Sequence, residues 1–227
     1  MTTDLFAGER HLLVILPHPD DESFGVAGVM AMLRQRGVPV TYVCATGGQM
    51  GRHMGRPPFA NRETLAALRR RELAEAMGIL NVADWRMLGL WDKTVEFEDR
   101  DRLAERLLAI IKEVNPSTLI TFHPEYGGHP DHKALGAAVI QAVEQLPPQE
   151  RPRVWCPVVQ KEHLNLGIPV VEVDITAFQE QKKAAFSAHR SQTSGWEERL
   201  AKNERMREEF SELFVKERFL VHPVSGS

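Results

Sequence analysis

Short apolar segments alternate with longer segments of helical spacing along most of this chain. Residues 11–17, with the sequence HLLVILP, form the Leu-rich and β-branched run that is typical of a strand buried in a parallel sheet. Further strands are predicted over residues 38–45, 85–88, 117–122, 154–159 and 170–173. Strand–helix–strand repetition predicts an α/β fold of three layers, in which a mostly parallel central sheet carries helices on both faces.

The helical segments end at residues that stop helices. Gly37 and Gly78 follow two of them, Asn115-Pro116 a third and Pro147-Pro148 a fourth. Helices are predicted over residues 23–36, 62–78, 100–114, 132–146, 175–188 and 195–214. Residues 46–61 are rich in Gly, Pro and Arg and predict a long loop, which in a compact domain is usually functional or mobile. The length of 227 residues is expected to form one domain, 1–227.

Composition excludes several classes of function. The net charge of −3 gives no general attraction to nucleic acid or to anionic membranes. The apolar runs are far shorter than the ~20 residues of a membrane span, and Asp4, Glu9 and Arg10 argue against a signal peptide. Cys44 and Cys156 are too far apart in sequence to indicate a disulfide scaffold. We therefore expect a cytoplasmic protein.

Two polar motifs follow predicted strands. PHPDDE, residues 17–22, comes directly after the first strand, and HPDH, residues 129–132, comes after the strand over 117–122 and opens a helix. In parallel sheets with helices on both faces, binding sites form at the carboxyl ends of the strands. The fold could therefore bring together two motifs that lie more than a hundred residues apart.

The two motifs contain the side chains that a metal-dependent hydrolase needs. His18, Asp21 and His132 would give three protein ligands and leave a coordination position for water, as in catalytic zinc sites. Asp20 could accept the proton of that water, and His129 could donate to the oxyanion that develops on an attacked carbonyl. Asp131 is predicted to orient His129.

Simpler interpretations exist for each motif. Either one alone could be a capped helix start, with Asp20 or Asp21 as the cap and Glu22 favouring the helix dipole. Both motifs at corresponding strand ends favour the metal site. Two other functions stay open: a metal-dependent phosphoesterase, which often has a second metal, and a non-catalytic protein that binds sugar or metal.

The two motifs at this spacing resemble the PIG-L/LmbE-like zinc deacetylases. Three further segments agree with this family: TGGQMG at residues 46–51, LRRREL at 68–73 and AHRSQ at 188–192. The resemblance implies a Rossmann-like, LmbE-like domain with the metal ligands and the catalytic residues named above. It also implies that Arg69 contacts substrate, and it makes Tyr126 a candidate for the substrate pocket. His189 is a candidate either for the pocket or for a residue that supports the site from behind. The cofactor implied is Zn²⁺, although the ligand set also suits Fe²⁺.

Within that family, residues 49–64 and 86–99 are similar to the second type of bacillithiol-biosynthesis deacetylase. This likeness implies a small amino-sugar substrate, N-acetylglucosaminyl-malate, which would be hydrolysed to acetate and glucosaminyl-malate. Other N-acetyl glycosides or thiol conjugates are alternatives. Members of the family form homo-oligomers, so the same is expected here. Guanidinium groups of the loop could pair with the malate carboxylates, or could be solvated at the surface: Arg52, Arg56 and Arg62.

Overall fold

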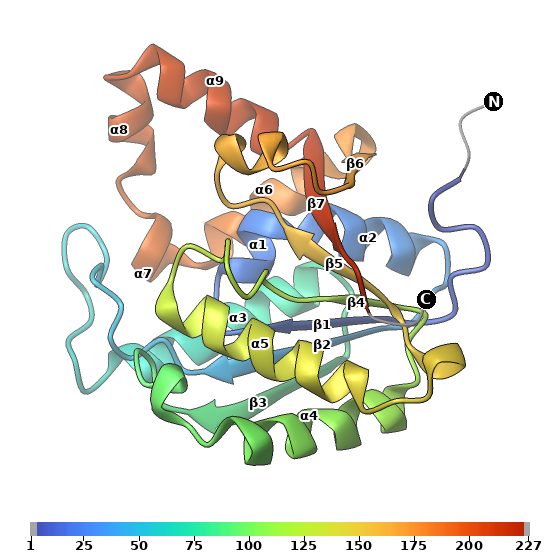
Figure 1. Ribbon diagram of the computed structural model, residues 1–227. Helices are drawn as coiled ribbons and strands as arrows, with labels where there is room; N and C mark the ends of the chain where they lie inside the picture. Colours follow the sequence, from blue (N-terminus) through green and yellow to red (C-terminus); the bar gives the residue numbers. More distant parts are fainter. Residues whose placement is uncertain (1–3, 225–227) are drawn as a thin grey trace.

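A seven-stranded sheet runs through the centre of the protein (Figure 1). The computed structural model describes residues 4–224, apart from the side chains of residues 197, 205 and 209, so the outermost residues of the expected domain lie outside it. The strand order is β3-β2-β1-β4-β5-β7-β6. The strands are β1 (Leu12–Leu16), β2 (Val40–Thr46), β3 (Asp84–Leu90), β4 (Thr118–Ile120), β5 (Arg153–Pro157), β6 (Val170–Asp174) and β7 (Lys216–His222).

The five strands from β3 to β5 pair in parallel, with β1 at their centre. Leu12 of β1 lies opposite Val40 of β2 on one side and Thr118 of β4 on the other. β7 pairs antiparallel with β5 and with β6. The mostly parallel α/β sheet predicted from the sequence is therefore confirmed.

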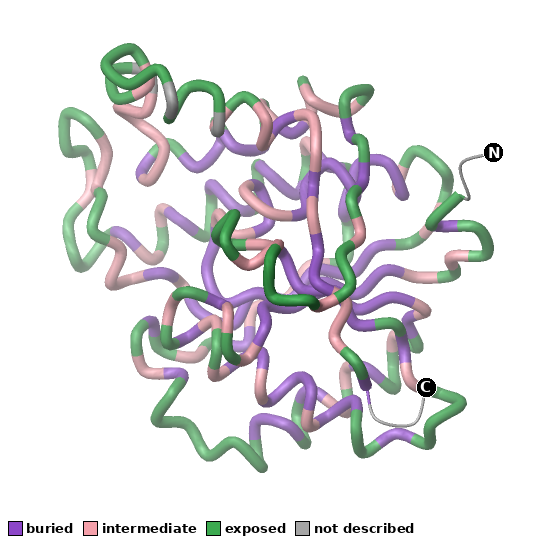
Figure 2. Tube along the Cα trace, turned by 45° about the horizontal axis from the view of Figure 1, so that its top comes forward, coloured by how far each residue is buried: buried purple, intermediate pink, exposed green. Residues whose placement is uncertain are grey.

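Helices cover both faces of the sheet (Figure 1). Leu12, Val14 and Leu16 join the core beneath α2 (Ala27–Gln35), α3 (Leu65–Ile79) and α6 (Gln179–Ala188). Leu13 and Ile15 join the opposite core beneath α4 (Arg100–Val114) and α5 (Pro130–Glu144). All five residues of β1 are buried, which explains why its sequence shows no alternation. Figure 2 shows this buried interior surrounded by exposed loops.

The ends of α4 and α5 follow from local chemistry. The Asp99 side chain accepts the backbone N–H groups of Asp101 and Arg102 and so caps α4. Asn115 ends α4 in the left-handed conformation, at φ 47°. Pro130 occupies the first turn of α5, where its missing N–H costs nothing. α5 thus begins two residues before the start that the sequence predicted, and the HPDH motif forms its first turn.

Other predicted boundaries need correction. The helix expected over 23–36 is divided into α1 (Asp21–Gly25) and α2, because the backbone at Val26 leaves the helical region, at φ −143°. After α7 (Arg190–Thr193), the helix expected over 195–214 is divided into α8 (Trp196–Ala201) and α9 (Glu204–Leu213). The side chain of Asn203 starts α9 by accepting the Met206 N–H. Short 3₁₀ segments complete the chain: η1 (Val95–Phe97), η2 (Pro148–Glu150), η3 (Lys161–Asn165) and η4 (Thr176–Phe178).

The sequence did not predict β7, because this strand buries a charged residue. Glu217 is almost fully buried, and its carboxylate lies 2.7 Å from the ammonium of Lys182, which is also fully buried. The same carboxylate accepts the N–H groups of Gly28 and Val29 at 2.8 Å and so holds the start of α2. An acidic residue at an inward position hides the apolar alternation by which a strand is recognised. No helix in residues 4–224 is long and apolar enough to cross a membrane.

We expect Lys182→Met to destabilise the fold, because it leaves the Glu217 carboxylate buried without its cation. The free energy of unfolding should fall by about 3 kcal/mol, measured by urea denaturation. Lys183→Met is the matched control, because the Lys183 ammonium pairs with Glu180 at the surface. Its effect should stay within about 0.5 kcal/mol, and equal losses in the two variants would contradict the expectation.

Candidate metal centre and active site

The loops at the carboxyl ends of β1, β3 and β4 meet at one edge of the sheet. β1 leads into His18, Asp20 and Asp21, β3 leads into Asp92, and the loop after β4 leads to the start of α5. The contacts between these loops bring together side chains that lie more than a hundred residues apart in sequence. His18 Nδ1 lies 3.2 Å from His132 Nε2, and carboxylate oxygens of Asp21 lie 3.4 Å from each of these two nitrogens.

Hydrogen bonds on the far side of each ring fix which nitrogen carries the proton. His132 Nδ1 lies 2.8 Å from the carbonyl oxygen of Gly127, which can only accept, so the lone pair is on Nε2. His18 Nε2 faces carboxylate oxygens of Asp131 at 3.1 Å and Asp92 at 3.2 Å, so the lone pair is on Nδ1. Two lone pairs and the Asp21 carboxylate therefore face one another. Only a proton or a cation between them relieves the repulsion.

The spacing of these donor atoms fits a divalent cation. Metal bonds of 2.0–2.2 Å in a tetrahedral site put neighbouring ligand atoms about 3.3–3.6 Å apart. The two ring nitrogens are 3.2 Å apart, and each lies 3.4 Å from a different oxygen of the Asp21 carboxylate. The site also favours positive charge. Burial acts to lower the pKa of His18. Hydrogen bonds with Asp131, Asp21 and Asp92 outweigh burial and raise this pKa well above its ordinary value. His18, Asp21 and His132 could therefore hold a metal ion.

Neighbouring groups hold the two imidazoles in place. The ring of Phe122 stacks on His132, with centroids 3.8 Å apart and planes at 5°. The backbone at Gly127 passes so close that a Cβ there would lie 2.9 Å from the His132 Cβ. Asp131 is fully buried and accepts the backbone N–H of Lys93 at 2.7 Å and that of Val95 at 3.2 Å, in addition to its contact with His18. Such outer contacts fix the orientation of metal-binding rings.

Asp20 and Asp21 are adjacent in sequence, but their surroundings are different. Burial raises the pKa of Asp20 to about 6, although the guanidinium of Arg69, 2.9 Å away, opposes this rise. Burial acts in the same direction on Asp21, but His132 and His18 outweigh it and hold the pKa of that carboxyl well below its usual range. Two carboxyl groups whose pKa values are pushed apart suit different roles. Asp21 suits a metal ligand, and Asp20 suits a group that accepts and releases a proton near neutral pH.

His129 lies beside these residues as the cap of α5. Its Nδ1 accepts the backbone N–H of Asp131 at 3.2 Å, and its ring centroid is 5.0 Å from that of His18. Burial lowers the pKa of His129, and nearby His18 and His132 lower it further, so the ring is neutral at pH 7. Because Nδ1 accepts, the single proton is on Nε2, which is then a donor. A ring nitrogen of His129 also lies within 4.8 Å of nitrogens of His18 and His132.

The structure refines one expected contact and corrects two. Asp131 was predicted to orient His129: its backbone N–H does donate to His129 Nδ1, while its carboxylate hydrogen-bonds the ring of His18. Arg69 and His189 were expected in the substrate pocket, but only 3% of Arg69 and 0% of His189 is exposed. Arg69 contacts Asp20 and also donates to the carbonyl oxygens of Pro19 and Gly48, while His189 contacts Glu22. Side chains so buried offer no surface to a sugar.

The other two expected substrate residues are accessible. Tyr126 is half-buried, with its ring 4.6 Å from that of His123 and 5.3 Å from that of His163. Arg52 is exposed in the long loop, and it has no polar partner among the side chains that the structure describes. Two other arginines of that loop are already engaged: Arg56 pairs with Glu198, and Arg62 donates to the carbonyl oxygen of Gly51.

Sequence reasoning missed two buried acids of the site. Asp92 is 3% exposed, contacts His18 Nε2 and accepts the Met50 N–H at 2.8 Å. It follows the end of β3, so the strand-end rule that found the two motifs could also have found it. Glu22 was considered only as part of a helix start, whereas its carboxylate is fully buried and hydrogen-bonded.

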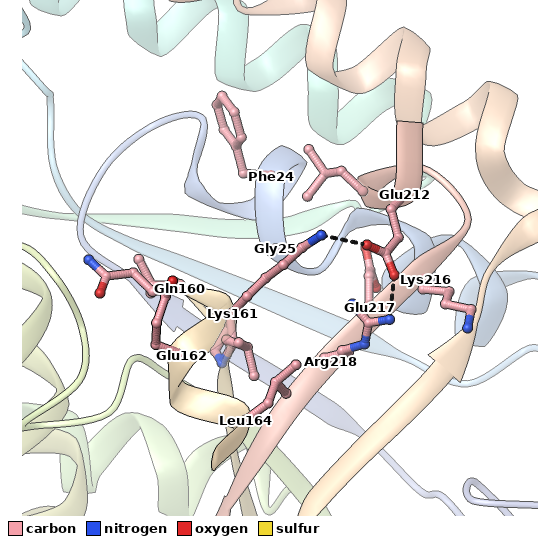
Figure 3. Close-up of a pocket in the computed structure, with 14 residues that line it drawn as sticks. Phe24, Gly25, Gln160, Lys161, Glu162, Leu164, Glu212, Lys216, Glu217 and Arg218 are labelled. Atoms are coloured by element: carbon pink, nitrogen blue, oxygen red, sulfur yellow. Dashed lines mark hydrogen bonds and ion pairs between the residues drawn. The ribbon is translucent and has the colours of Figure 1, made fainter. Parts of the chain in front are cut away.

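A separate hollow of about 370 Å³ lies beside α1 (Figure 3). Phe24 and Gly25 line it from α1, and the remaining lining comes from residues 157–164 and 212–218. Lys161 and Arg218 both reach the carboxylate of Glu212, at 3.1 and 2.5 Å, so these charges are already paired (Figure 3). None of the metal-centre residues described above lines this hollow, and its paired charges give no sign of the ligand it would take.

Known proteins share both the sequence and the fold of this chain. Residues 13–143 match the family model described as PIG-L: GlcNAc-PI de-N-acetylase. A Bacillus cereus protein named "Probable N-acetyl-alpha-D-glucosaminyl L-malate deacetylase 2" is 50% identical over 82% of this chain and 84% of its own length. The Bacillus subtilis protein of the same name is 50% identical over 86% of this chain and 91% of its own. The solved structure of N,N'-diacetylchitobiose deacetylase from Pyrococcus horikoshii, with an inhibitor, is 28% identical, with a TM-score of 0.72 over 97% of this chain and 88% of its own.

Gly127→Ala tests whether the close backbone contact at residue 127 supports a metal site. The added Cβ would lie 2.9 Å from the His132 Cβ and 3.0 Å from the His123 carbonyl oxygen, so the His132 ring must move. We expect the affinity for a divalent cation to fall about 10–100-fold, measured by competition with a chromophoric chelator. Gly78→Ala is the control, because a Cβ there meets no atom within 4 Å. Unchanged affinity in Gly127→Ala would argue against this support.

Proposed function

Because the chain belongs to the PIG-L family of GlcNAc-PI de-N-acetylases, as its motifs predicted, we propose that it is a zinc-dependent deacetylase of N-acetylglucosaminyl-malate. The proposal rests on one observation above all. The ring nitrogens of His18 and His132 and the carboxylate of Asp21 face one another, and Asp20 is close enough for the charges of Asp21 and His18 to act on its pKa. Ferrous iron suits the same ligand set, so the native metal is part of the proposal.

Two side chains of this protein, Asp20 and His129, can accept or donate the protons that the reaction requires. When bound by His18, Asp21 and His132, a divalent ion would polarise the acetyl carbonyl and acidify a water molecule. The Asp20 carboxylate takes a proton from the attacking water, a role that its pKa near 6 supports. His129 donates its Nε2–H to the carbonyl oxygen as that oxygen becomes negatively charged.

Asp20 also completes the reaction. The proton that it took from water passes to the sugar nitrogen, so that the C–N bond breaks with an amine as the leaving group and acetate as the second product. Arg69 contacts the Asp20 carboxylate at 2.9 Å and is held by two backbone carbonyl groups. The guanidinium thereby limits where Asp20 can point and prevents its pKa from rising further.

The malate part of the substrate would need a cationic partner, for which Arg52 is the available group of the loop. Arg56 and Arg62 are engaged with protein groups, whereas Arg52 has no polar partner in the described part of the chain. A guanidinium can bind a carboxylate through two parallel hydrogen bonds. The name shared by the Bacillus relatives supports this substrate for the present chain. The homo-oligomer remains a prediction from the family resemblance.

Substitution of the two neighbouring aspartates should separate proton transfer from metal binding. Asp20→Asn should keep the metal and lower kcat about 10²–10⁴-fold, because the amide cannot take a proton. Asp21→Asn should lose metal, because an amide is a weaker ligand than a carboxylate. Release of amine from N-acetylglucosaminyl-malate and elemental analysis of the purified proteins measure the two effects.

The wild type serves as the reference for both variants and should contain close to one metal per chain. If Asp20→Asn retained near-wild-type turnover with metal bound, the assignment of Asp20 as the base would be wrong. A ratio near two metals, with activity on phosphate esters, would favour the phosphoesterase. Sugar binding without turnover in metal-replete protein would favour a binding protein.

Arg52→Ala should affect one substrate more than another. We expect KM for N-acetylglucosaminyl-malate to rise about tenfold, the loss of roughly 1.4 kcal/mol from one charged contact. KM for N-acetylglucosamine, which has no carboxylate, should not change. Arg71→Ala removes an exposed arginine from α3 and is the matched control. An equal change in KM for both substrates would contradict a carboxylate contact at Arg52.

A further inference from the structure

The backbone of Asp20 adopts a conformation that residues with a side chain rarely take. Its φ is 115° and its ψ is −29°. For a residue other than glycine, such a conformation costs on the order of 1–3 kcal/mol and persists only where the surroundings impose it. Asp20 joins His18 and Pro19 to Asp21, so its φ determines how its carboxylate lies relative to the ligand that follows it.

Glu22 holds the backbone N–H of Asp20 in this conformation. Its Oε2 accepts the N–H of Asp20 at 3.1 Å, two residues back along the chain. The same carboxylate accepts the hydroxyl of Tyr42 at 3.2 Å and that of Ser23 at 2.7 Å. Glu22 is 0% exposed. Within the described residues its side chain hydrogen-bonds Asp20, Ser23, Tyr42 and His189, and none of these belongs to the metal trio of His18, Asp21 and His132. It is therefore buried behind the Asp20–Asp21 turn, away from the reacting groups.

His189 holds Glu22 from the opposite side. Its Nε2 lies 2.6 Å from Glu22 Oε1, and both side chains are fully buried. His189 follows the end of α6, and the next turn of chain is itself fixed, because Glu72 of α3 accepts both the N–H and the hydroxyl of Ser191, at 2.7 and 2.6 Å. The position of the Glu22 carboxylate is thus set by α6, α7 and α3 together.

We propose that Glu22 and His189 are positioning residues for the deacetylation reaction. His189 fixes the carboxylate of Glu22, Glu22 fixes the N–H of Asp20, and the resulting backbone conformation aims the Asp20 side chain at the water beside the metal trio. This inference rests on the proposed function, since it assigns to Asp20 the role of base. It gives the buried His189 a role through Glu22, which is the supporting role that the sequence left open beside a contact with substrate.

A purely structural role predicts a different result from the one we expect. A buried ion pair can often be replaced by apolar side chains of similar volume with no loss of stability, whereas removing one partner is costly. If the pair only stabilises the fold, a stable apolar replacement should restore full activity. If the pair positions Asp20, the same replacement should fold and still be slow, because no group accepts the Asp20 N–H.

The test is a double variant, Glu22→Met with His189→Leu, together with the single variant Glu22→Gln. For the double variant we expect a folded protein with wild-type metal content and a lowered Tm, because the hydroxyls of Tyr42 and Ser23 lose their acceptor. Its kcat should fall about 10–100-fold and its KM should change less than about twofold. In its crystal structure the φ of Asp20 should leave the positive region. Glu22→Gln keeps an oxygen that can accept the Asp20 N–H, so its kcat should stay within about threefold of the wild type.

A second buried pair of the same kind supplies the control. Lys182 and Glu217 lie 2.7 Å apart and are both buried, and Lys182 belongs to α6, the helix that ends next to His189. Lys182→Met with Glu217→Gln should leave kcat unchanged. Wild-type kcat in the Glu22/His189 double variant, or an unchanged φ at Asp20, would overturn the proposal, as would an equal loss of kcat in the Lys182/Glu217 control. If the double variant does not fold, a Glu22→Gln variant that folds but is slowed 10-fold or more would overturn it.

The proposed function can fail separately. Wild-type protein with no turnover of any N-acetylated sugar would refute the function, but the comparison of the Asp20 φ between wild type and double variant would still decide whether Glu22 and His189 position this residue.

Discussion

Three electron pairs that face one another across 3.2–3.4 Å are the constraint on which the site depends. His18, Asp21 and His132 would repel one another without a positive charge between them, and the surrounding hydrogen bonds do not allow the rings to turn away. Gly127 fixes one ring, and Asp131 and Asp92 fix the other. The fold keeps these groups together because the strands that lead into them, β1, β3 and β4, end at the same edge of one parallel sheet.

The buried carboxyl groups around the metal trio differ in the direction of their pKa shifts. Asp131, Asp92 and Asp21 have lowered pKa values and contact the imidazoles directly. Asp20 differs, because burial raises its pKa to about 6 and its nearest cation is the guanidinium of Arg69. One carboxyl group of the cluster can therefore exchange a proton near neutral pH while the others remain anionic. This division supports a reaction that needs both a metal site and a proton acceptor.

Contacts between helices and the Asp20–Asp21 turn connect residues remote from the metal trio to the loop that carries its ligands. Arg69 of α3 binds the side chain of Asp20, and Glu22, held by His189, binds its backbone. The long loop that contains Arg52 is attached less closely and is exposed at its tip. If the buried frame positions the base and the exposed loop contacts the substrate, as we propose, substitutions confined to the loop would change the substrate without disturbing the metal trio.

Much of this could be predicted from the sequence, because it depends on local patterns. Apolar runs and helix stops predicted the mostly parallel sheet, and the two motifs at strand ends predicted which side chains would converge. Hydrogen-bond partners could not be predicted, since they depend on which loops become neighbours once the sheet has formed. For that reason Asp92 was missed, the contact of the Asp131 carboxylate with His18 was not predicted, and β7 was hidden by the buried charge of Glu217. The sequence by itself thus determined the chemistry available to this protein. Only the tertiary structure decided which groups face the metal trio and which, like Arg69 and His189, are buried behind it, because burial and pairing are properties of the packed chain.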